Sequence, residues 1–345
     1  MRLITTAELG NARLLGGDRD LWKRSIEAWT AVEIDETREA PVDWSPATHR
    51  TTLGAPFYVT GPSTYSRKER STLHFEPAKQ EGWWIDRTDL EEQLPIRVSV
   101  RNVWDTKRSI VLRSGSAHNY LRMIEHIIAL RLGIGLDDAM VRVHGGDPPL
   151  FNAGSAPIID AIRQVGLVTN PDRPLTYWTV KEPVTLMGPS GSFLHVSPPE
   201  EGNRKLSIDC AIDFDTVIGQ QRIRFDVWDG AFHHGAHART NCKRFEWWFV
   251  RSAGKLFADI RNLGYTGENI LIAGRNSYAN EAKLMHNDKS LEAVWHRATL
   301  DLVAALSLVE KGRLAADIVS YKAGHALDVR LITHLYKHDL LTPLP

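Results

Sequence analysis

The chain has 345 residues, more than one compact core usually holds and about the length of two domains of typical size. Lysine plus arginine and aspartate plus glutamate are equal at 42 each, so no net basic charge is available to hold nucleic acid or anionic lipid. With 43% hydrophobic and 24% charged residues, the composition is that of an ordinary globular protein and excludes disorder. Only Cys210 and Cys242 occur, and the sequence has neither a signal-like N-terminus nor an apolar run of about 18 residues. We therefore expect a soluble cytoplasmic protein without a membrane span.

The N-terminal residues 1–46 differ in sequence pattern from the rest of the chain. They combine a short helical pattern with the acidic stretch VEIDETREAPVDW. The apolar positions of that pattern are Leu21, Trp22, Ile26 and Trp29. We interpret these 46 residues as an N-terminal extension.

A series of short β-like runs begins at Thr48, each bounded by Gly, Pro or charged residues. The runs are PFYVTG, STLHFEP, WWID, IRVSV and SIVLRS. The next segment, HNYLRMIEHIIALRLGIG, has apolar residues at helical spacing and two glycines at its end, which predicts a helix with one buried face. Residues 47–175 are thus predicted to form a sheet followed by helix.

The same order of elements recurs in residues 176–345. The strand-like runs are LTYWTVKEPVTLM, SFLHVSP, LSIDCAIDF and QRIRFDVW. A long helix is predicted from about Lys289 to Glu310, and a C-terminal helix in YKAGHALDVRLITHL. Because strands precede helices in each half instead of alternating with them, we predict an α+β fold of two similar sheet-plus-helix domains.

Adjacent Glu125 and His126 are the first candidate site. On a helix their side chains point about 100° apart, so one metal ion could take the imidazole while the carboxylate addresses the metal-bound water. Surface or core packing is the simpler interpretation of the pair. No GxxxxGK[ST] motif supports nucleotide chemistry, and no GxSxG motif supports a serine nucleophile.

Two further segments contain potential ligands. FHHGAHART supplies His233, His234 and His237, but the glycine indicates a loop in which these histidines are solvated or structural. In KSLEAVWHRATLDL, Glu292 and His296 share a helix face. In the same segment, Arg297 and Asp301 are spaced for a salt bridge, and a charged solvent face is the alternative for both pairs. The tryptophan pairs at 83–84 and 247–248 lie in strand-like runs and are expected to pack in the core or an interface.

Several segments, taken in order, resemble the zinc-dependent UDP-3-O-acyl-N-acetylglucosamine deacetylases of lipid A synthesis. They are EHIIALRLGIGLDDAMVRV, LSIDCAIDFD, RIRFDVWDGAF, ARTN, LDLVAAL and SYKAGHALDVRL. The resemblance is collinear from about Arg50 to Leu335, and HRTTLGAPFYVTG, WIDRTDL and LFNAGSAP agree with it. It implies that each domain layers a β-sheet with two helices and that the active cleft lies between the domains, here 47–175 and 176–345.

The resemblance also implies roles for matching residues. Glu125 corresponds to the general base, His126 to a zinc ligand and Thr240 to a stabiliser of the tetrahedral oxyanion. His325 corresponds to a cationic acid near the leaving amine, and Asp301 to the carboxylate that holds it. A histidine oriented by a carboxylate stays partly protonated near neutral pH and can donate to a leaving nitrogen.

The predicted metal helix departs from the family pattern. That pattern is HKxxD, with a later Asp that matches Asp301. Counted back from Asp301 without a gap, Ala293 and Arg297 occupy the two ligand positions and Val294 replaces the lysine. In this register the zinc site is dismantled.

A one-residue insertion between His296 and Asp301, such as a π-bulge, gives a different register. Glu292 and His296 then fall on the two ligand positions, and His126, Glu292 and His296 form a hydrolytic Zn²⁺ site with an open position for water. The continuous apolar stripe of the helix gives no sign of such a bulge, so both registers stay open.

Further departures favour a changed substrate. Tyr65 falls about where the family's GLH histidine would lie, and residues 1–46 have no counterpart in the family. We expect a metal-dependent amidohydrolase that removes an acyl group from an acylated amino sugar or sugar nucleotide. The alternative is a catalytically inactive homologue that binds a ligand or partner through the same cleft.

Overall fold

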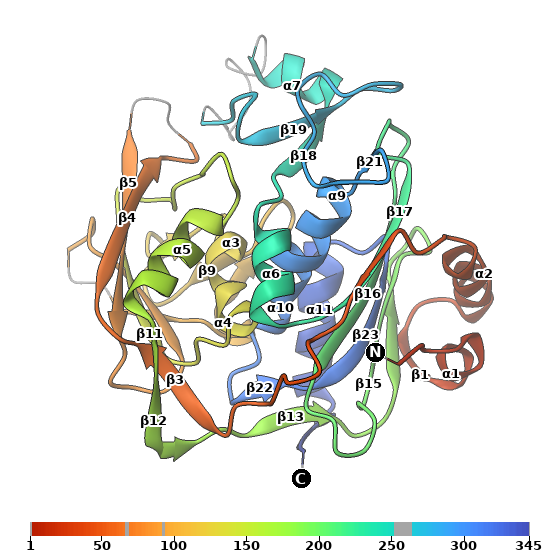
Figure 1. Ribbon diagram of the computed structural model, residues 1–345, viewed down its shortest axis with the longest axis horizontal. Helices are drawn as coiled ribbons and strands as arrows, with labels where there is room; N and C mark the ends of the chain where they lie inside the picture. The colour runs from red at the N-terminus through yellow and green to blue at the C-terminus, as the bar shows by residue number, and fades with distance from the viewer. Residues whose placement is uncertain (1, 66–68, 92–93, 252–263, 345) are drawn as a thin grey trace.

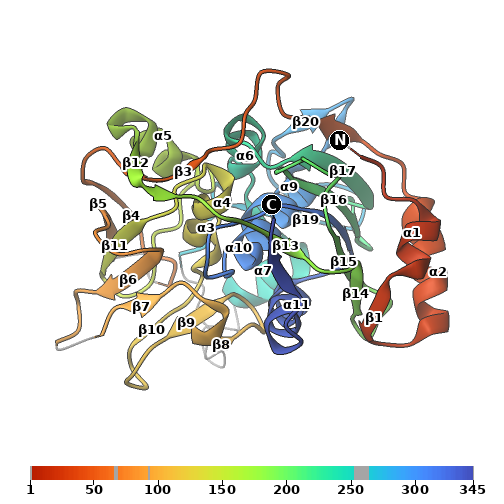
Figure 2. The ribbon, with the colours of Figure 1, turned by 90° about the horizontal axis from the view of Figure 1, so that it is seen from below.

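Two β-sheets enclose a central layer of helices in the computed structural model of the chain (Figure 1). The structure describes residues 2–65, 69–91, 94–251 and 264–344. The view in Figure 2 shows the same arrangement from below, with the five-stranded sheet on the left and the seven-stranded sheet on the right. The two N-terminal helices lie outside the seven-stranded sheet, away from the central layer.

The larger sheet has the strand order β1-β14-β15-β23-β16-β17-β2. Its strands are β1 (Arg13–Gly16), β14 (Val184–Met187), β15 (Phe193–Ser197), β23 (Ala316–Tyr321), β16 (Leu206–Asp213), β17 (Gln220–Asp226) and β2 (Glu36–Arg38). Both edge strands come from the N-terminal segment: β1 pairs parallel to β14, and β2 pairs parallel to β17. The predicted N-terminal extension is therefore integrated into this sheet.

The second sheet has the order β4-β5-β11-β6-β7. Its strands are β4 (Phe57–Pro62), β5 (Arg70–Pro77), β11 (Ala139–His144), β6 (Trp83–Arg87) and β7 (Ile96–Arg97). Three strands, β8 (Val103–Asp105), β9 (Val111–Arg113) and β10 (Tyr120–Leu121), form a smaller sheet, and β13 (Tyr177–Val180), β22 (Arg313–Leu314) and β24 (Leu341–Pro343) form another. The remaining strands pair two by two: β3 (His49–Leu53) with β12 (Leu167–Pro174), β18 (Thr240–Lys243) with β19 (Ile270–Ala273), and β20 (Met285–His286) with β21 (Lys289–Ser290).

The central layer contains most of the helices (Figure 1). The helices are α1 (Thr6–Asn11), α2 (Arg19–Thr30), the short 3₁₀ helix Val100–Asn102, α3 (Glu125–Ile128), α4 (Leu130–Gly133), α5 (Ala156–Val165), α6 (Asp229–Ala236), α7 (Arg244–Arg251), α9 (Glu292–Trp295), α10 (Val303–Leu306) and α11 (His325–Lys337). Between α9 and α10 the chain continues without a break as a π-helix, His296–Leu302.

Alternation along the strands explains why both faces of the seven-stranded sheet are covered. In β15, Leu194 and Val196 join the central core, whereas Phe193 packs on the opposite face against the N-terminal helices. Trp22 and Trp29 of α2 are buried there, as the helical spacing of that segment predicts.

One hydrophobic core joins the two halves of the chain. The largest cluster of buried side chains includes Phe75 and Val141 of the five-stranded sheet, Ile208 and Phe225 of the seven-stranded sheet, and Leu302 of the helical layer between them. The predicted α+β class is confirmed. The division into two similar domains at about residue 175 stays a prediction.

Most of the predicted strands are found, and two local predictions are wrong. Trp83 and Trp84 lie in β6 as expected, but Trp247 and Trp248 lie in helix α7 and not in a strand. His233 and His234 lie in helix α6 and not in a loop. Gly235 is tolerated within α6 because it lies at a close approach, where a Cβ atom would come within 2.4 Å of the side chain of Thr299.

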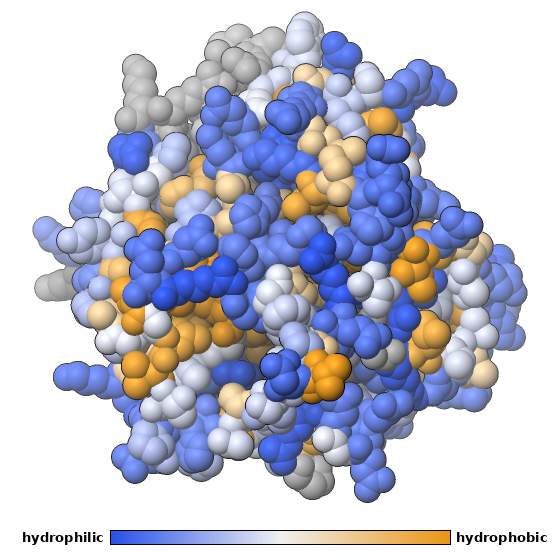
Figure 3. All heavy atoms as spheres, in the orientation of Figure 1, coloured by the Kyte–Doolittle hydropathy of each residue, from blue (hydrophilic) through white to orange (hydrophobic). Residues whose placement is uncertain are grey.

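The face of the molecule in Figure 3 is largely hydrophilic, in keeping with the balanced charge of the sequence. Hydrophobic side chains on this face gather mainly on its left part. Within the described residues, none of the helices has the length and apolar character needed to cross a membrane.

Candidate functional site

Three helices of the central layer bring five of the predicted residues together. Glu125 and His126 are the first two residues of α3. His296 and Asp301 lie in the π-helix, and His325 is the first residue of α11, after Gly324. Just before α3, Met123 has a positive φ of 54°, a conformation that is uncommon for a residue other than glycine and clusters at functional sites. These placements bring together residues that lie up to 200 positions apart in the sequence.

The two imidazoles face each other across the boundary between the halves of the chain. Nε2 of His126 lies 3.1 Å from Nε2 of His296, with ring centroids 5.1 Å apart. On its other side, Nδ1 of His296 lies 3.5 Å from Oδ1 of Asp301. A carboxylate on the second ring nitrogen fixes the orientation and tautomer of a functional histidine.

Asp301 also reaches His325, which lies beside Glu125. Nε2 of His325 is 3.7 Å from Oδ1 of Asp301 and 4.0 Å from Oε1 of Glu125. The other oxygen of Glu125 accepts a hydrogen bond from the backbone N–H of Ile110 at 3.1 Å. The side chain of Glu125 is 3% exposed and that of His325 is 19% exposed, so the cluster is open to solvent at His325.

Burial and neighbouring charges set the protonation states of these groups. Burial raises the pKa of Glu125, partly offset by His325. Burial would lower the pKa of His325, but Asp301 and Glu125 together raise it by more, so the net shift is upward. Burial lowers the pKa of His126 to about 3, so its imidazole is neutral near pH 7. Burial would raise the pKa of Asp301, yet His296 and His325 hold it well below its usual range.

Two groups in the cluster have unused hydrogen-bonding capacity. Among the described residues, no hydrogen-bond partner reaches Oδ1 of Asp301 or Nδ1 of His325, although both atoms are buried. Buried polar atoms are normally hydrogen-bonded, and exceptions call for an explanation such as an unseen water or a ligand. These atoms are therefore available to a water molecule or a substrate.

The π-helix agrees with one of the two sequence registers. Its presence at His296–Leu302 agrees with the register that inserts one residue between His296 and Asp301. The expected salt bridge between Arg297 and Asp301 is wrong: Arg297 donates to Oδ1 of Asp328 at 2.6 Å and to the carbonyl of Ala323 at 2.8 Å. In a π-helix the backbone bonds run from i to i+5, so Asp301 lies a turn away from His296 and not from Arg297. The Arg297–Asp328 pair fixes the first turn of α11, and with it His325.

The carboxylate of Glu292 is bound by groups other than the two histidines. Its carboxylate is held by Arg239, whose Nε and backbone N–H donate to Oε1 at 2.6 and 3.0 Å and whose Nη2 donates to Oε2 at 3.0 Å. The backbone N–H of Lys283 donates to Oε2 at 2.9 Å. Both side chains of this ion pair are almost completely buried, so Glu292 has a structural partner for each oxygen.

A hydrolytic zinc site normally has three protein ligands. Two nitrogens bound to a tetrahedral zinc at 2.0–2.1 Å lie about 3.3 Å apart, close to the 3.1 Å between His126 and His296. The described residues contain no group of three His, Cys, Asp or Glu side chains arranged to hold a metal ion. The histidine pair thus fits zinc, whereas the predicted set of three ligands that includes Glu292 does not.

The remaining predicted residues have other contacts. Thr240 is the first residue of β18 and pairs with Ile270, one position after Arg239. Nε2 of His233 lies 3.2 Å from Oδ1 of Asp160 on α5, and His237 packs edge-to-face on His233 with ring centroids 4.8 Å apart. Neither His126 nor His296 takes part in these contacts.

Sequence reasoning missed a tyrosine and an arginine near Glu125. The backbone N–H of Gly264 donates to the carbonyl of Thr64 at 3.3 Å, which brings the segment of Tyr265 next to that of Tyr65. The guanidinium of Arg122 lies 3.9 Å from the ring centre of Tyr65. Burial raises the pKa of Tyr65 to about 12, so its phenol remains a hydrogen-bond donor. No motif around Tyr265 or Arg122 could have identified them, because their contacts join segments that are distant in sequence, 200 positions apart for Tyr65 and Tyr265 and 57 for Tyr65 and Arg122.

Comparison with known proteins agrees with this geometry. A family model described as UDP-3-O-acyl N-acetylglycosamine deacetylase matches residues 50–337. A UDP-3-O-acyl-N-acetylglucosamine deacetylase of Citrifermentans bemidjiense is 30% identical over 267 residues, covering 77% of this chain and 82% of the relative. Relatives of the same description from Syntrophus aciditrophicus and Brucella ovis are 26% identical, covering 77% and 84% of this chain and 80% and 96% of their own lengths.

Proposed function

The chain belongs to the UDP-3-O-acyl N-acetylglycosamine deacetylase family, and from this premise we propose that it hydrolyses the amide of an N-acylated amino sugar. The observation that supports the proposal is the convergence of Glu125, Asp301 and His325 beside the paired imidazoles of His126 and His296. The family is zinc-dependent and acts on an acylated sugar nucleotide. A substrate of related but altered structure is proposed for this chain, because the resemblance puts Tyr65 about where the family's GLH histidine would fall and because Arg239 binds the carboxylate of Glu292.

Glu125 acts as the general base in this proposal. Its raised pKa makes it a stronger base than an exposed carboxylate, and it accepts the proton of the water that attacks the amide carbonyl. His325 acts as the general acid, since Asp301 and Glu125 favour its protonated form and it can donate that proton to the leaving nitrogen. The products are a carboxylate and a free amine. Thr240 is proposed to stabilise the tetrahedral oxyanion, on the family correspondence alone.

A catalytically inactive homologue is the second candidate, and the absence of a third ligand beside His126 and His296 in the described ranges favours it. In that case the same cluster would bind a ligand without cleaving it. The substitution of Glu125 separates the two functions, because a base matters only when an amide is cleaved.

The decisive experiment measures free amine released from UDP-3-O-acyl-N-acetylglucosamine and from simpler N-acetyl sugars, with zinc supplied. Glu125→Gln should lower kcat by about 10²- to 10⁴-fold while ligand affinity stays near that of the wild type. Glu182→Gln is the matched control, because Glu182 is paired with Arg13 in an exposed ion pair outside the cluster. No amine from any of these substrates would favour the inactive homologue.

A further inference from the structure

The segment Asp35–Arg38 contacts the helix that carries His296. It lies before residue 50, where the family match begins, and three of its residues form edge strand β2. Oε2 of Glu36 accepts a hydrogen bond from Nε1 of Trp295 at 2.9 Å. Nε of Arg38 donates to the other oxygen of Glu36 at 2.6 Å. A part of the chain without a counterpart in the family match therefore reaches the residue next to a proposed site histidine.

Trp295 fills the space between the seven-stranded sheet and helix α6. It is completely buried, and its ring centre lies 5.1 Å from that of Phe225 on β17 and 5.0 Å from that of His234 on α6. The guanidinium of Arg38 lies 5.8 Å from its ring centre. Since successive helical side chains point about 100° apart, Trp295 faces the sheet while His296 faces His126.

The hydrogen bond at the indole determines how the ring can rotate. A buried N–H without a partner is destabilising, so Trp295 is held in the rotation that keeps Nε1 on Glu36. His296 begins the π-helix immediately after it, and the carbonyl of Trp295 accepts a hydrogen bond from Oγ1 of Thr299 within that helix. A change in the packing of Trp295 would therefore shift the first residues of the π-helix.

We propose that Glu36 is a positioning residue for His296 and acts through the indole of Trp295. The kinetic consequence rests on the proposed function, whereas the effect on the orientation of His296 does not. The N-terminal segment is, in this view, a structural part of the active site and not an appendage. A purely structural contact at the sheet edge would instead lower stability and leave the site unchanged.

Four variants separate these possibilities. Glu36→Ala removes the acceptor, and Glu36→Gln keeps an oxygen that can accept from Nε1. Trp295→Phe removes the donor. Lys289→Met is the matched control, because Lys289 binds Oδ1 of Asp35 at 2.6 Å in the same segment without contacting Trp295.

We expect Glu36→Ala to lower kcat by about tenfold or more, the range of partners that orient a functional histidine, with little change in KM. Glu36→Gln and Lys289→Met should retain kcat near that of the wild type. In the Trp295→Phe background, Glu36→Ala should cause no further loss, since the two residues act through one contact. Equal loss of stability in Glu36→Ala and Lys289→Met with unchanged kcat in both would overturn the proposal.

A readout that does not depend on turnover distinguishes failure of this inference from failure of the proposed function. Side-chain ¹⁵N NMR spectra of the histidines report the contact between Nε2 of His126 and Nε2 of His296. Glu36→Ala should shift these signals, and Glu36→Gln and Lys289→Met should not. If the wild type releases no amine, the proposed function fails and the spectra still decide the role of Glu36. Unshifted signals in Glu36→Ala would overturn it.

Discussion

Asp301 is the residue on which the proton chemistry of the cluster depends. It lies between His296 and His325, at 3.5 and 3.7 Å, and its negative charge raises the pKa of His325 against the effect of burial. The base must be ionised and the acid protonated, so activity should show a bell-shaped dependence on pH. In the proposed mechanism the acid limb should report Glu125 and lie above the ordinary carboxyl pKa of about 4.3, and the basic limb should report His325 and lie above the ordinary imidazole pKa of about 6.5.

Asp301→Asn should move the basic limb to lower pH. The neutral amide no longer favours the imidazolium, so His325 loses its proton earlier as the pH rises. The measurement is kcat/KM against pH for the wild type and the variant. Asp339→Asn, which changes an exposed partner of Lys181, should leave the profile unchanged. A basic limb that does not move in Asp301→Asn would contradict the pairing.

The zinc ligands can be tested at the same scale. Uptake of zinc should depend on His296, because its Nε2 faces that of His126. It should not depend on Glu292, because Arg239 is hydrogen-bonded to the carboxylate of Glu292. His296→Ala should abolish the uptake measured by metal analysis of dialysed protein. Glu292→Gln should lower the free energy of unfolding by about 3–5 kcal/mol, as expected when one partner of a buried ion pair is removed.

Per folded chain, however, Glu292→Gln should keep the zinc content of the wild type. Loss of zinc from this variant at full folding would make Glu292 a ligand. Absence of uptake by the wild type would contradict the assignment of the histidine pair.

At the scale of elements, the π-helix His296–Leu302 sets the spacing of the site. It places His296 and Asp301, five residues apart, on one side of the helix, which an α-helix would not do. Thr299 contributes a side-chain hydrogen bond from Oγ1 to the carbonyl of Trp295 at 2.6 Å. Because π-turns occur mostly at functional sites and are less regular than α-turns, this bond is expected to matter for activity as well as stability.

Thr299→Val tests the π-helix with little change of shape. It should lower the free energy of unfolding by about 0.5–1.5 kcal/mol and also lower kcat. Thr333→Val is the matched control, since Oγ1 of Thr333 makes the same kind of bond to the carbonyl of Val329 in α11, at 2.9 Å. Urea unfolding and kcat are measured for both. Similar kinetics of the two variants would mean that the π-turn does not govern the site.

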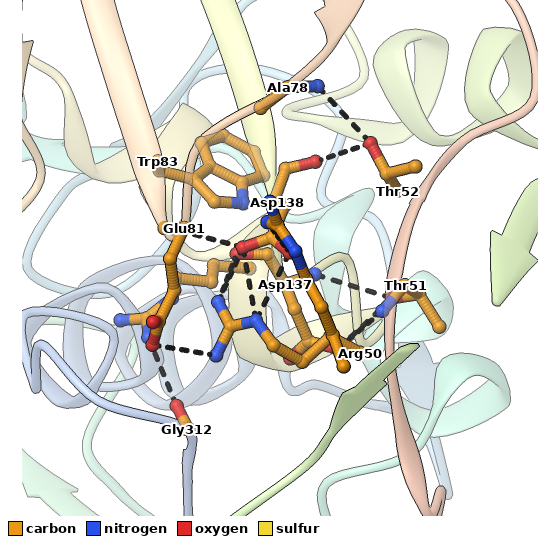
Figure 4. Close-up of polar contacts among 12 residues, drawn as sticks. Arg50, Thr51, Thr52, Ala78, Glu81, Trp83, Asp137, Asp138 and Gly312 are labelled. Carbon is orange, nitrogen blue, oxygen red and sulfur yellow. Dashed lines mark hydrogen bonds and ion pairs between the residues drawn. The ribbon is translucent and has the colours of Figure 1, made fainter. Parts of the chain in front are cut away.

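For the whole molecule, buried charges join the two halves of the chain at the end away from β18 and β19 (Figure 4). Asp137 binds Arg313 of the other half with both carboxylate oxygens at 2.9 Å, and beside it Arg50 forms a buried pair with Asp138 within the first half. Arg131 donates to the carbonyls of Ser307, Val309 and Gly312, across the same boundary. Removing one half would take these partners away from Arg131 and Asp137.

We therefore expect the chain to unfold in one cooperative transition. The shared hydrophobic core and the charges that cross it make the separate stability of either half unfavourable. Urea unfolding followed by far-UV circular dichroism and by tryptophan fluorescence should give coincident curves. Two separated transitions would show instead that the halves are independent folding units.

Residue order was enough to identify the local features of the chain. Period-2 runs identified strands such as β4, β5 and β16, because each buries at least one face against the helical layer. Helical spacing identified α2 and α11, including its start at His325. The adjacent Glu125 and His126 and the collinear resemblance indicated the family, since both depend only on the order of residues.

Only the folded chain shows which of the candidate residues contact one another. Glu292 and His296 have the spacing of a ligand pair, yet Arg239, 53 positions earlier, binds Glu292 and leaves His296 to His126. The π-turn left no trace in the apolar stripe, because the buried helix is apolar on several sides. The N-terminal segment forms both edge strands of the larger sheet, β1 and β2, because β14 and β17 have backbone groups that these strands can pair with. Such outcomes depend on partners that are distant in sequence, and no local pattern contains them.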